Sequence, residues 1–206
     1  MKIVAISDTH GQHRELEVPE ADLLIHAGDF TRRGHLSEAS EFAEWLTGLP
    51  HRHKVVIAGN HDWCFQETPT EARELLSGVS YLEDSCVVVE GFKIYGSPWQ
   101  PWFLNWAFNL ERGPELQEKW AMIPEDVDIL LTHGPPYGIG DRTSGGEVVG
   151  CKDLLDRIQH IKPKFHFCGH IHEGAGVRVR DETKFINASS VDANYRILGS
   201  PVVIEI

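Results

Sequence analysis

Short apolar runs that end in polar turns recur along the whole chain of 206 residues. Runs of about four to eight residues, bounded by Gly, Pro, Asn or Asp, are typical of buried β-strands. On this pattern we predict strands over five segments: 2–6, 23–26, 54–57, 128–131 and 165–167. A turn that contains Asp, Asn or His follows each of them.

Helical periodicity occupies intervals between these strands. We predict helices over 37–46, 71–76 and 153–161. In the last of these, Leu154, Ile158 and Ile161 recur at the spacing of one helix face. Because strands alternate with helices, we predict an α/β protein built on β-sheet.

Two further pairs of segments surround short turns, and we predict that each pair is antiparallel. Residues 86–90 would pair with 93–95, and 177–180 with 184–187. A last strand is predicted over 202–206. The sequence has no repeat, low-complexity stretch or linker, so we predict a single domain over 1–206.

Composition narrows the class of protein. A content of 41% hydrophobic and 24% charged residues is typical of a soluble globular protein, and no apolar run reaches the length of about 18 residues that would predict a membrane span. The formal net charge of −12 argues against duplex nucleic acid as a partner. The four cysteines lack C-x-x-C spacing, so we expect free thiols and a cytoplasmic location.

The polar turns after the strands contain the residue types that ligate metal ions. The candidates are two carboxylates, one amide and four imidazoles: Asp8, His10, Asp29, Asn60, His133, His170 and His172. In open α/β sheets, ligands bind outside the carboxyl ends of the strands, so these side chains are expected at one site. Seven ligands are too many for one ion but suit two ions that share a carboxylate.

The spacing within two of the motifs is also informative. Asp8 and His10, like His170 and His172, stand at positions i and i+2, which point to one face of an extended segment. We therefore expect each pair to point into a common cavity. Mixed nitrogen and oxygen ligation favours manganese, iron or zinc over magnesium or calcium, and we expect two divalent ions, with manganese favoured.

Taken singly, most of these motifs have ordinary explanations. D-x-H and G-D are common in surface turns, and a lone strand-end histidine such as His133 is more often bonded to a carbonyl. G-N-H-D, at 59–62, is much rarer by chance. The ordered combination at successive strand ends indicates a functional site.

The order D-x-H, G-D, G-N-H-D, H and G-H-x-H resembles the signature of the calcineurin-like metallophosphoesterases, from residue 3 to about residue 190. More narrowly, G-S-P-W-Q-P-W-F, L-T-H-G-P-P and G-H-I-H-E-G resemble the small metallophosphoesterase-domain-containing subgroup, which is related to the class III cyclic-nucleotide phosphodiesterases. The resemblance implies two mixed β-sheets packed together and flanked by helices.

The resemblance also implies a role for each motif residue. Asp8, His10 and His172 would hold one ion, and Asn60, His133 and His170 would hold the other. Asp29 would bridge the two ions. His61 would face the substrate as a proton donor or a charge stabiliser, with Asp62 orienting it.

Residues 95–120 contain four of the six tryptophans. They either fill the packing between sheet and helices or form a homo-oligomer contact. The other interpretation is a loop over the metal site, in which Trp99, Trp102 and Trp106 would stack on an aromatic part of the substrate. Arg32 is a candidate phosphate contact, with plain surface exposure as its alternative.

The leading functional interpretation is a phosphodiesterase that hydrolyses small organic phosphodiesters, with cyclic nucleotides among the candidates, by attack of a metal-bridging hydroxide. One alternative is a phosphomonoesterase or protein phosphatase on the same metal centre. Another is a non-catalytic scaffold of the same fold, against which the intact His61 and His170 argue. Net charge disfavours a nuclease.

Overall fold

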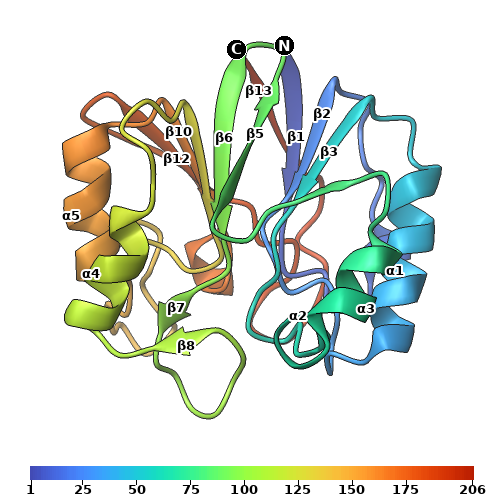
Figure 1. Ribbon diagram of the computed structural model, residues 1–206, viewed down its shortest axis with the longest axis horizontal. Coiled ribbons are helices and arrows are strands. Elements are labelled where there is room, and N and C mark those ends of the chain that lie inside the picture. Colours follow the sequence, from blue (N-terminus) through green and yellow to red (C-terminus); the bar gives the residue numbers. More distant parts are fainter.

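The structure is a computed structural model that describes residues 1–206, and two β-sheets stand face to face at its centre (Figure 1). The first sheet has five strands in the order β13 (Val202–Glu205), β1 (Lys2–Ile6), β2 (Leu23–His26), β3 (His53–Val56) and β4 (Ser80–Tyr81). The second has six, in the order β11 (Gly176–Arg180), β12 (Thr183–Asn187), β10 (Phe165–Cys168), β9 (Ile129–Thr132), β6 (Phe92–Ser97) and β5 (Ser85–Val89). Both sheets are mixed, because β13, β11 and β5 run antiparallel to their neighbours.

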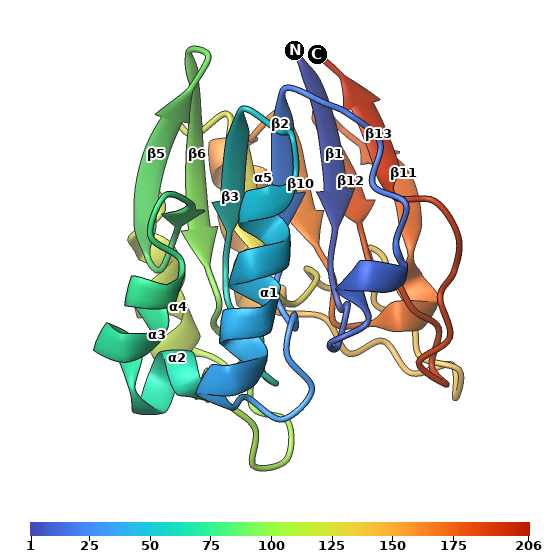
Figure 2. The same cartoon turned by 90° about the vertical axis from the view of Figure 1, so that its right-hand side faces the viewer.

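Helices cover the outer face of each sheet (Figures 1 and 2). The first sheet carries α1 (Leu36–Gly48), α2 (Cys64–Glu67) and α3 (Pro69–Leu75), and the second carries α4 (Pro114–Ala121) and α5 (Lys152–Ile161). Short 3-10 helices cover His13–Glu15 and His172–Gly174. A small parallel ribbon, β7 (Gln100–Pro101) with β8 (Asn109–Leu110), lies outside both sheets.

Strand β1 shows why the central strands are continuous apolar runs. Ile3 and Ala5 face the core between the sheets, while Val4 and Ile6 face the core under α1. All four residues are fully buried, since the strand has protein on both sides. Every apolar position of the run therefore contributes to one of two cores.

The predicted architecture is confirmed. All five predicted strands, both antiparallel pairs, the last strand and the three helices are present, with ends that differ by at most two residues. Helix α4 was not predicted, because its eight residues bury only Leu116 and Trp120 on one face. The ribbon β7–β8 and the helix α2 were also not predicted, since two to four residues are too few to show a period.

The loops that follow β1, β2, β3, β9 and β10 gather at one end of the sandwich, and the two chain termini lie at the other end (Figure 1). This arrangement follows from the parallel pairing of β1 with β2 and β3, and of β9 with β10. No helix is both long and apolar enough to pass through a membrane. All four cysteines are free, as expected.

Candidate metal centre

The strand-end loops bring all seven candidate ligands together, six of them in two groups and the seventh between the groups. We call Asp8, His10 and His172 the Asp8 cluster, and Asn60, His133 and His170 the Asn60 cluster. Asp29 is part of neither cluster and lies between the two. Five of the seven residues are at most 3% exposed, and His170 and His172 are partly buried.

In the Asp8 cluster, a carboxylate and two imidazoles face one another. The Nε2 atom of His172 lies 3.6 Å from Oδ1 of Asp8 and 3.4 Å from Nε2 of His10. One ligand atom from each of the three residues lies within 4.8 Å of the other two. This spacing suits ligands that surround one ion.

The Asn60 cluster converges in the same way around a neutral amide. Nε2 of His133 lies 2.9 Å from Oδ1 of Asn60 and 3.4 Å from Oδ2 of Asp29. His170 has a ligand atom within 4.8 Å of those of Asp29 and His133. The same Oδ2 of Asp29 lies 3.9 Å from Nε2 of His10, so one carboxylate oxygen faces both clusters.

Backbone carbonyls orient two of the imidazoles. Nδ1 of His133 donates to the carbonyl of Ala27, and Nδ1 of His172 donates to that of Asp192, each at 3.0 Å. A histidine whose Nδ1–H is held in this way presents Nε2 to a metal ion. Both rings are therefore set in the orientation that metal ligation requires.

The carboxylates are held as firmly as the imidazoles. Asp8 accepts from the hydroxyl of Ser189 at 2.8 Å and from the backbone N–H of His170 at 3.0 Å. Asp29 accepts from the backbone N–H of His61 at 2.7 Å. Each carboxylate is thus tied to a loop from a different strand end.

The loop backbone corrects the prediction that the i, i+2 pairs lie in extended segments. Asp8, His10, Asp29 and His170 all have left-handed backbone, with φ of 54°, 43°, 57° and 66°. Non-glycine residues rarely adopt this conformation, which occurs mostly at functional sites. As a result His170 and His172 face different clusters, although only one residue separates them.

Two glycines allow the loops to approach the carboxylates closely. A Cβ on Gly169 would lie 2.1 Å from Oδ2 of Asp8, and one on Gly59 would lie 2.4 Å from Oδ1 of Asp29. These distances are far below van der Waals contact, so any side chain here would displace the carboxylates. The glycines of G-H-x-H and G-N-H-D are therefore part of the site.

The pKa values show how the protein balances this buried charge without ions. Burial alone would lower the pKa of His133 and of His172, but Asp29 raises the first to about 9 and Asp8 raises the second to about 8. Burial would raise the pKa of both carboxyls, but the facing histidines hold them well below the usual range. Protons on two imidazoles thus neutralise two carboxylates.

The other two histidines are neutral. Burial lowers the pKa of His10 to about 4 and that of His170 to about 3. Neutral imidazoles and ionised carboxylates are the forms that bind metal, and divalent ions would replace the two protons. The donor set therefore fits a pair of metal ions.

His61 lies beside the Asp8 cluster, with its ring 4.6 Å from that of His10. Its Nδ1 donates to the carbonyl of Arg32 at 2.9 Å, and its ring stacks on Trp106 at a centroid distance of 4.2 Å. The imidazole is therefore oriented by a backbone carbonyl and an aromatic face.

The structure shows the hydrogen-bond partners of Asp62, which is predicted to orient His61. This fully buried carboxylate accepts hydrogen bonds from the backbone of Asp29, Thr31 and Gly59, at 2.8 to 2.9 Å, and from the hydroxyl of Thr31 at 2.7 Å. It ties together the loops after β2 and β3, while Arg32 supplies the carbonyl that faces His61. Asp62 is thus a positioning residue for the loop backbone.

The other predicted substrate contacts lie in different surroundings. Trp102 is exposed and lines a cavity beside His170, and Trp106 stacks on His61. Trp99 is half-buried, donates to Asp84 at 3.0 Å and packs on Phe108. The side chain of Arg32 is exposed. The structure therefore places Trp102 and Trp106 next to site residues and Trp99 in the packing.

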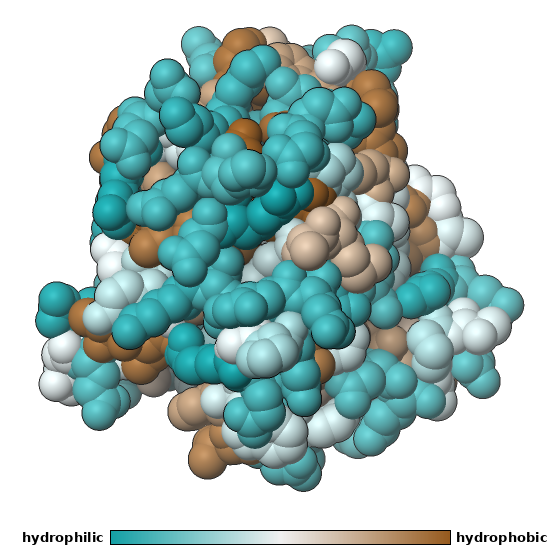
Figure 3. Space-filling view, turned by 60° about the vertical axis from the view of Figure 1, so that its left-hand side comes forward, coloured by the Kyte–Doolittle hydropathy of each residue, from teal (hydrophilic) through white to brown (hydrophobic).

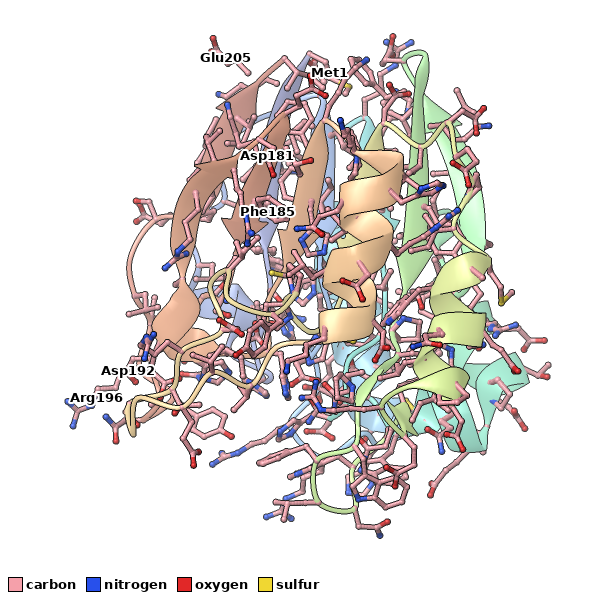
Figure 4. All side chains as sticks on the ribbon, turned by 90° about the vertical axis from the view of Figure 1, so that its left-hand side faces the viewer. Met1, Asp181, Phe185, Asp192, Arg196 and Glu205 are labelled. Atoms are coloured by element: carbon pink, nitrogen blue, oxygen red, sulfur yellow. The ribbon has the colours of Figure 1, made fainter.

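Tyr195 is a site residue that the sequence analysis missed. Its ring lies 4.9 Å from that of His10 and 5.6 Å from that of His172, and its backbone is left-handed, with φ of 60°. Asp192 holds this turn through hydrogen bonds to Asn194 and Arg196. In Figure 4 the labelled Asp192 and Arg196 mark the loop, at the end of the molecule remote from Met1. No motif in the sequence distinguished this tyrosine.

Comparison with solved structures supports the fold. A structure of the protein TT1561 from Thermus thermophilus aligns with a TM-score of 0.66 at 17% identity, over 91% of this chain and 88% of that one. A structure described as a novel archaeal phosphodiesterase aligns over the full length of both chains, with a TM-score of 0.52 at 16% identity. At these identities the likeness concerns the fold alone.

Comparison of sequences goes further. Metallophosphoesterase domain-containing protein 1 of Homo sapiens is 44% identical over 230 aligned residues, which cover 100% of this chain and 71% of the human protein. A Caenorhabditis elegans protein, UPF0046 protein C25E10.12, is 38% identical over 100% of this chain and 81% of its own length. Residues 1–174 match the calcineurin-like phosphoesterases as a family. This chain, with its buried His and Asp clusters at the strand ends, belongs to the calcineurin-like phosphoesterase family.

Proposed function

We propose that the protein is a binuclear metal-dependent phosphodiesterase that hydrolyses small organic phosphodiesters. The observation that carries this proposal is the pair of ligand clusters that share one oxygen of Asp29. Two ions that share a carboxylate form the arrangement used for in-line displacement at phosphorus. Membership of a phosphoesterase family supports the same reaction class.

In this proposal the Asp8 cluster would hold one ion, the Asn60 cluster would hold the other, and Asp29 would contact both. When bound, the ions supply Lewis acidity, which neutralises the phosphoryl oxygens and makes water acidic enough to react near neutral pH. Manganese, iron and zinc suit the mixed nitrogen and oxygen donors, and we favour manganese. Two ions also exceed the charge of Asp8 and Asp29, so the centre would attract an anion within a chain of net charge −12.

His61 is proposed to give its proton to the departing ester oxygen. Its Nδ1 is occupied by the carbonyl of Arg32, which leaves Nε2 to face the substrate. Trp106 stacks on one face of the ring and restricts its rotation. Positioned proton transfer of this kind contributes about 10²- to 10⁴-fold to rate.

Two observations support a small diester, the first bearing on its size and the second on the diester bond. The chain is acidic overall, which disfavours a long polyanion such as duplex DNA. A solved structure of similar fold is described as a phosphodiesterase. Cyclic nucleotides are among the diesters that we propose to test.

The proposal is tested with bis(4-nitrophenyl) phosphate and purified protein that has been stripped of metal and reloaded with Mn²⁺, Zn²⁺ or Mg²⁺. We expect manganese-dependent turnover that is abolished by His133→Ala. We also expect His61→Asn to lower kcat by about 10²- to 10⁴-fold while metal content stays at two ions per chain. Absence of turnover on any phosphate ester, with two ions bound, would disprove the proposal.

A phosphomonoesterase on the same centre is the principal alternative. The ratio of kcat/KM for bis(4-nitrophenyl) phosphate and 4-nitrophenyl phosphate distinguishes the two, because both substrates release the same phenolate. A ratio well above one supports a diesterase, and a ratio below one supports a monoesterase. Absence of bound metal after purification and reloading would instead support a scaffold.

A further inference from the structure

Two fully buried histidines lie in the strands and are not candidate metal ligands. His26 is the last residue of β2 and His166 lies in β10, and both side chains are 0% exposed. Figure 3 shows mostly hydrophilic atoms on the side of the molecule that carries α4 and α5 in Figure 1, whereas His166 lies beneath that surface against Phe185. Because a buried imidazole needs hydrogen-bond partners, the partners of both rings are informative.

Both of these imidazoles are neutral. Burial lowers the pKa of His26 to about 3 and that of His166 to about 3. The ring of His26 also meets those of Phe30 and Phe42 edge to face, at centroid distances of 5.7 and 5.0 Å. A neutral imidazole has one N–H donor and one acceptor nitrogen, so its neighbours determine which nitrogen has the proton.

The neighbours of His26 place its proton on Nε2. The backbone N–H of Gly28 lies 3.2 Å from Nδ1, and because an amide N–H only donates, Nδ1 accepts. Nε2 therefore has the proton and donates to the hydroxyl oxygen of Thr9 at 3.1 Å. Thr9 directly precedes the candidate ligand His10. Gly28 directly precedes Asp29, so His26 joins the loop after β1 to the loop after β2.

His166 makes the corresponding bond in the second sheet. The hydroxyl of Thr132 donates its single hydrogen to the carbonyl of Gly134 at 2.7 Å, so its oxygen can only accept from His166. Nε2 of His166 lies 2.8 Å from that oxygen and donates to it. Thr132 directly precedes the candidate ligand His133. Each sheet thus contains one buried histidine bonded to the threonine before a ligand histidine.

The bond to Thr132 leaves part of the His166 ring without a partner. Nδ1 of His166 is buried and has no hydrogen-bond partner in the protein. A buried acceptor without a partner costs folding free energy, and an apolar side chain of similar size would avoid that cost. The contribution of this imidazole is therefore the donor that it offers to Thr132 rather than packing.

The two threonines stand at turns whose backbone needs support. Thr9 lies between Asp8 and His10, which both have left-handed backbone, with φ of 54° and 43°. Thr132 bridges across His133, because its hydroxyl bonds the carbonyl two residues further on. Side-chain hydrogen bonds to such turns stabilise backbone conformations that the residues do not prefer by themselves.

We infer that His26 and His166 are positioning residues of the candidate metal centre. One acts through Thr9 on the Asp8 cluster, and the other acts through Thr132 on the Asn60 cluster. Groups that hold metal ligands from outside the coordination sphere typically change metal affinity by about 10- to 100-fold. The inference rests on the metal centre of the proposed function, but it is independent of the substrate.

The test compares Thr9→Val with Thr132→Val, which both remove the hydroxyl and preserve the shape of the side chain. Protein freed of metal is titrated calorimetrically with Mn²⁺, which gives a dissociation constant for each ion. We expect each variant to raise one constant by about tenfold or more and to leave the other nearly unchanged, with a different ion affected in each variant. Thr9→Ser and Thr132→Ser keep the hydroxyl and should bind both ions as the unaltered protein does.

Variants of the histidines test the donor directly. His166→Gln keeps an N–H within reach of Thr132 and should preserve manganese binding, whereas His166→Leu should weaken the ion of the Asn60 cluster. The unfolding temperature of metal-free His166→Leu should not fall, because the unpaired Nδ1 is removed as well. In the first sheet, His26→Gln keeps the donor to Thr9 and should bind manganese more tightly than His26→Leu.

Thr183→Val is the matched control. Thr183 is 4% exposed and its hydroxyl donates to the carbonyl of Pro163 at 2.7 Å, but it is the first residue of β12, at the end of that strand remote from the metal centre. This variant should lower the unfolding temperature and leave both dissociation constants unchanged.

Two results would overturn the inference. One is manganese binding by Thr9→Val and Thr132→Val that equals that of Thr183→Val. The other is an equal loss of binding in His166→Gln and His166→Leu. Selective loss of one ion in each threonine variant, without turnover of any phosphate ester by the loaded protein, would support the inference and contradict the proposed function. Failure of the unaltered protein to bind two ions would contradict both.

Discussion

The two ligand clusters differ in charge although they share one carboxylate. The Asp8 cluster has a carboxylate of its own, whereas the Asn60 cluster has a neutral amide at the corresponding place. Their surroundings differ as well. Tyr195 lies against the Asp8 cluster, and the cavity lined by Trp102 and His170 opens beside the Asn60 cluster.

This difference predicts that the two clusters differ in their affinity for a metal ion and in how strongly the bound ion attracts phosphate. At an effective dielectric constant of about 20, a unit charge about 4 Å away changes the energy of another unit charge by about 4 kcal/mol. An ion in the Asp8 cluster would therefore be held more tightly than one in the Asn60 cluster. An ion in the Asn60 cluster would be less neutralised and would lie next to the cavity, where it would attract the phosphate of the proposed substrate most strongly.

The largest effect is expected from Asp29→Ala, because Oδ2 of Asp29 faces both clusters. We expect both ions to bind poorly and activity on bis(4-nitrophenyl) phosphate to fall by about a thousandfold or more. Metal content by mass spectrometry and turnover are measured together. Asp29→Asn, which preserves shape, is the control. Retention of two ions in Asp29→Ala would show that the carboxylate does not join the clusters.

Next in size is the paired comparison of His170→Gly with His172→Gly. Each should lose about one ion per chain and most of its activity, since two ions act together on one phosphate. Because the Asn60 cluster binds its ion more weakly, His170→Gly should keep the tightly held ion and His172→Gly the exchangeable one. Dialysis against graded chelator concentrations measures this. Loss of the same ion in both variants would contradict the separation of the clusters.

Asn60→Asp tests the charge difference itself. A second carboxylate should tighten binding of the weaker ion by about tenfold or more. It should also weaken binding of inorganic phosphate as an inhibitor, because the centre loses one positive charge. Calorimetric titration with Mn²⁺ measures the first effect and inhibition kinetics the second. Asn60→Gln serves as the neutral control. Unchanged manganese affinity in Asn60→Asp would contradict the prediction that the charge of the ligands makes the two clusters differ in ion affinity.

The pH dependence of stability distinguishes ion-free from loaded protein. The pKa of His172 is raised to about 8 and that of His133 to about 9 from an ordinary 6.5. Their contribution to folding is therefore fully present below pH 6.5 and is lost as pH rises through 8 and 9. We expect the unfolding temperature of chelator-treated protein to fall across this range, while bound ions, which replace both protons, reduce the fall.

Thermal unfolding at pH 6, 7.5 and 9, with chelator or with Mn²⁺, checks this expectation. His133→Gln removes one of the two protons and should flatten the curve of the ion-free protein above pH 8. Identical pH dependence with and without manganese would contradict the exchange of protons for ions.

The smallest effect is expected at Tyr195. Its ring contacts the candidate metal ligands His10 and His172, but it is not itself a candidate ligand. Tyr195→Phe keeps the ring and should change kcat/KM by less than about tenfold, the range of one hydrogen bond. Tyr195→Ala removes the contact with His10 and His172 and should also weaken the ion of the Asp8 cluster. Equal effects on the ions of both clusters would show that the tyrosine acts on folding in general.

Much of the fold and the identity of the candidate ligands could be predicted from the sequence. Strands β1 and β2 contain the continuous apolar runs Ile3–Ile6 and Leu23–Ile25 because they have protein on both faces, and that pattern is local. The ligand motifs stand directly after strands that pair in parallel, so each sheet brings its motifs to one end. Residue types and the position of each motif after a predicted strand were the basis of both predictions.

Other features depended on contacts that no local pattern records. Left-handed backbone at His170 directs His170 and His172 to different clusters, because tertiary contacts stabilise a conformation that the residue does not prefer. Tyr195 reaches the site through a turn held by Asp192. In both cases the decisive contact joins residues far apart in the chain: His170 with Asp8, and Tyr195 with His10.

The chain by itself determined which residues could ligate metal and at which end of the strands they would gather, because residue type, spacing and apolar runs are properties of neighbours. Only the tertiary structure decided that Asp62 positions backbone, that Trp99 is packing and that Trp102 faces a cavity. The physical reason is that such roles depend on hydrogen-bond partners and free space, which exist only after distant segments have packed together.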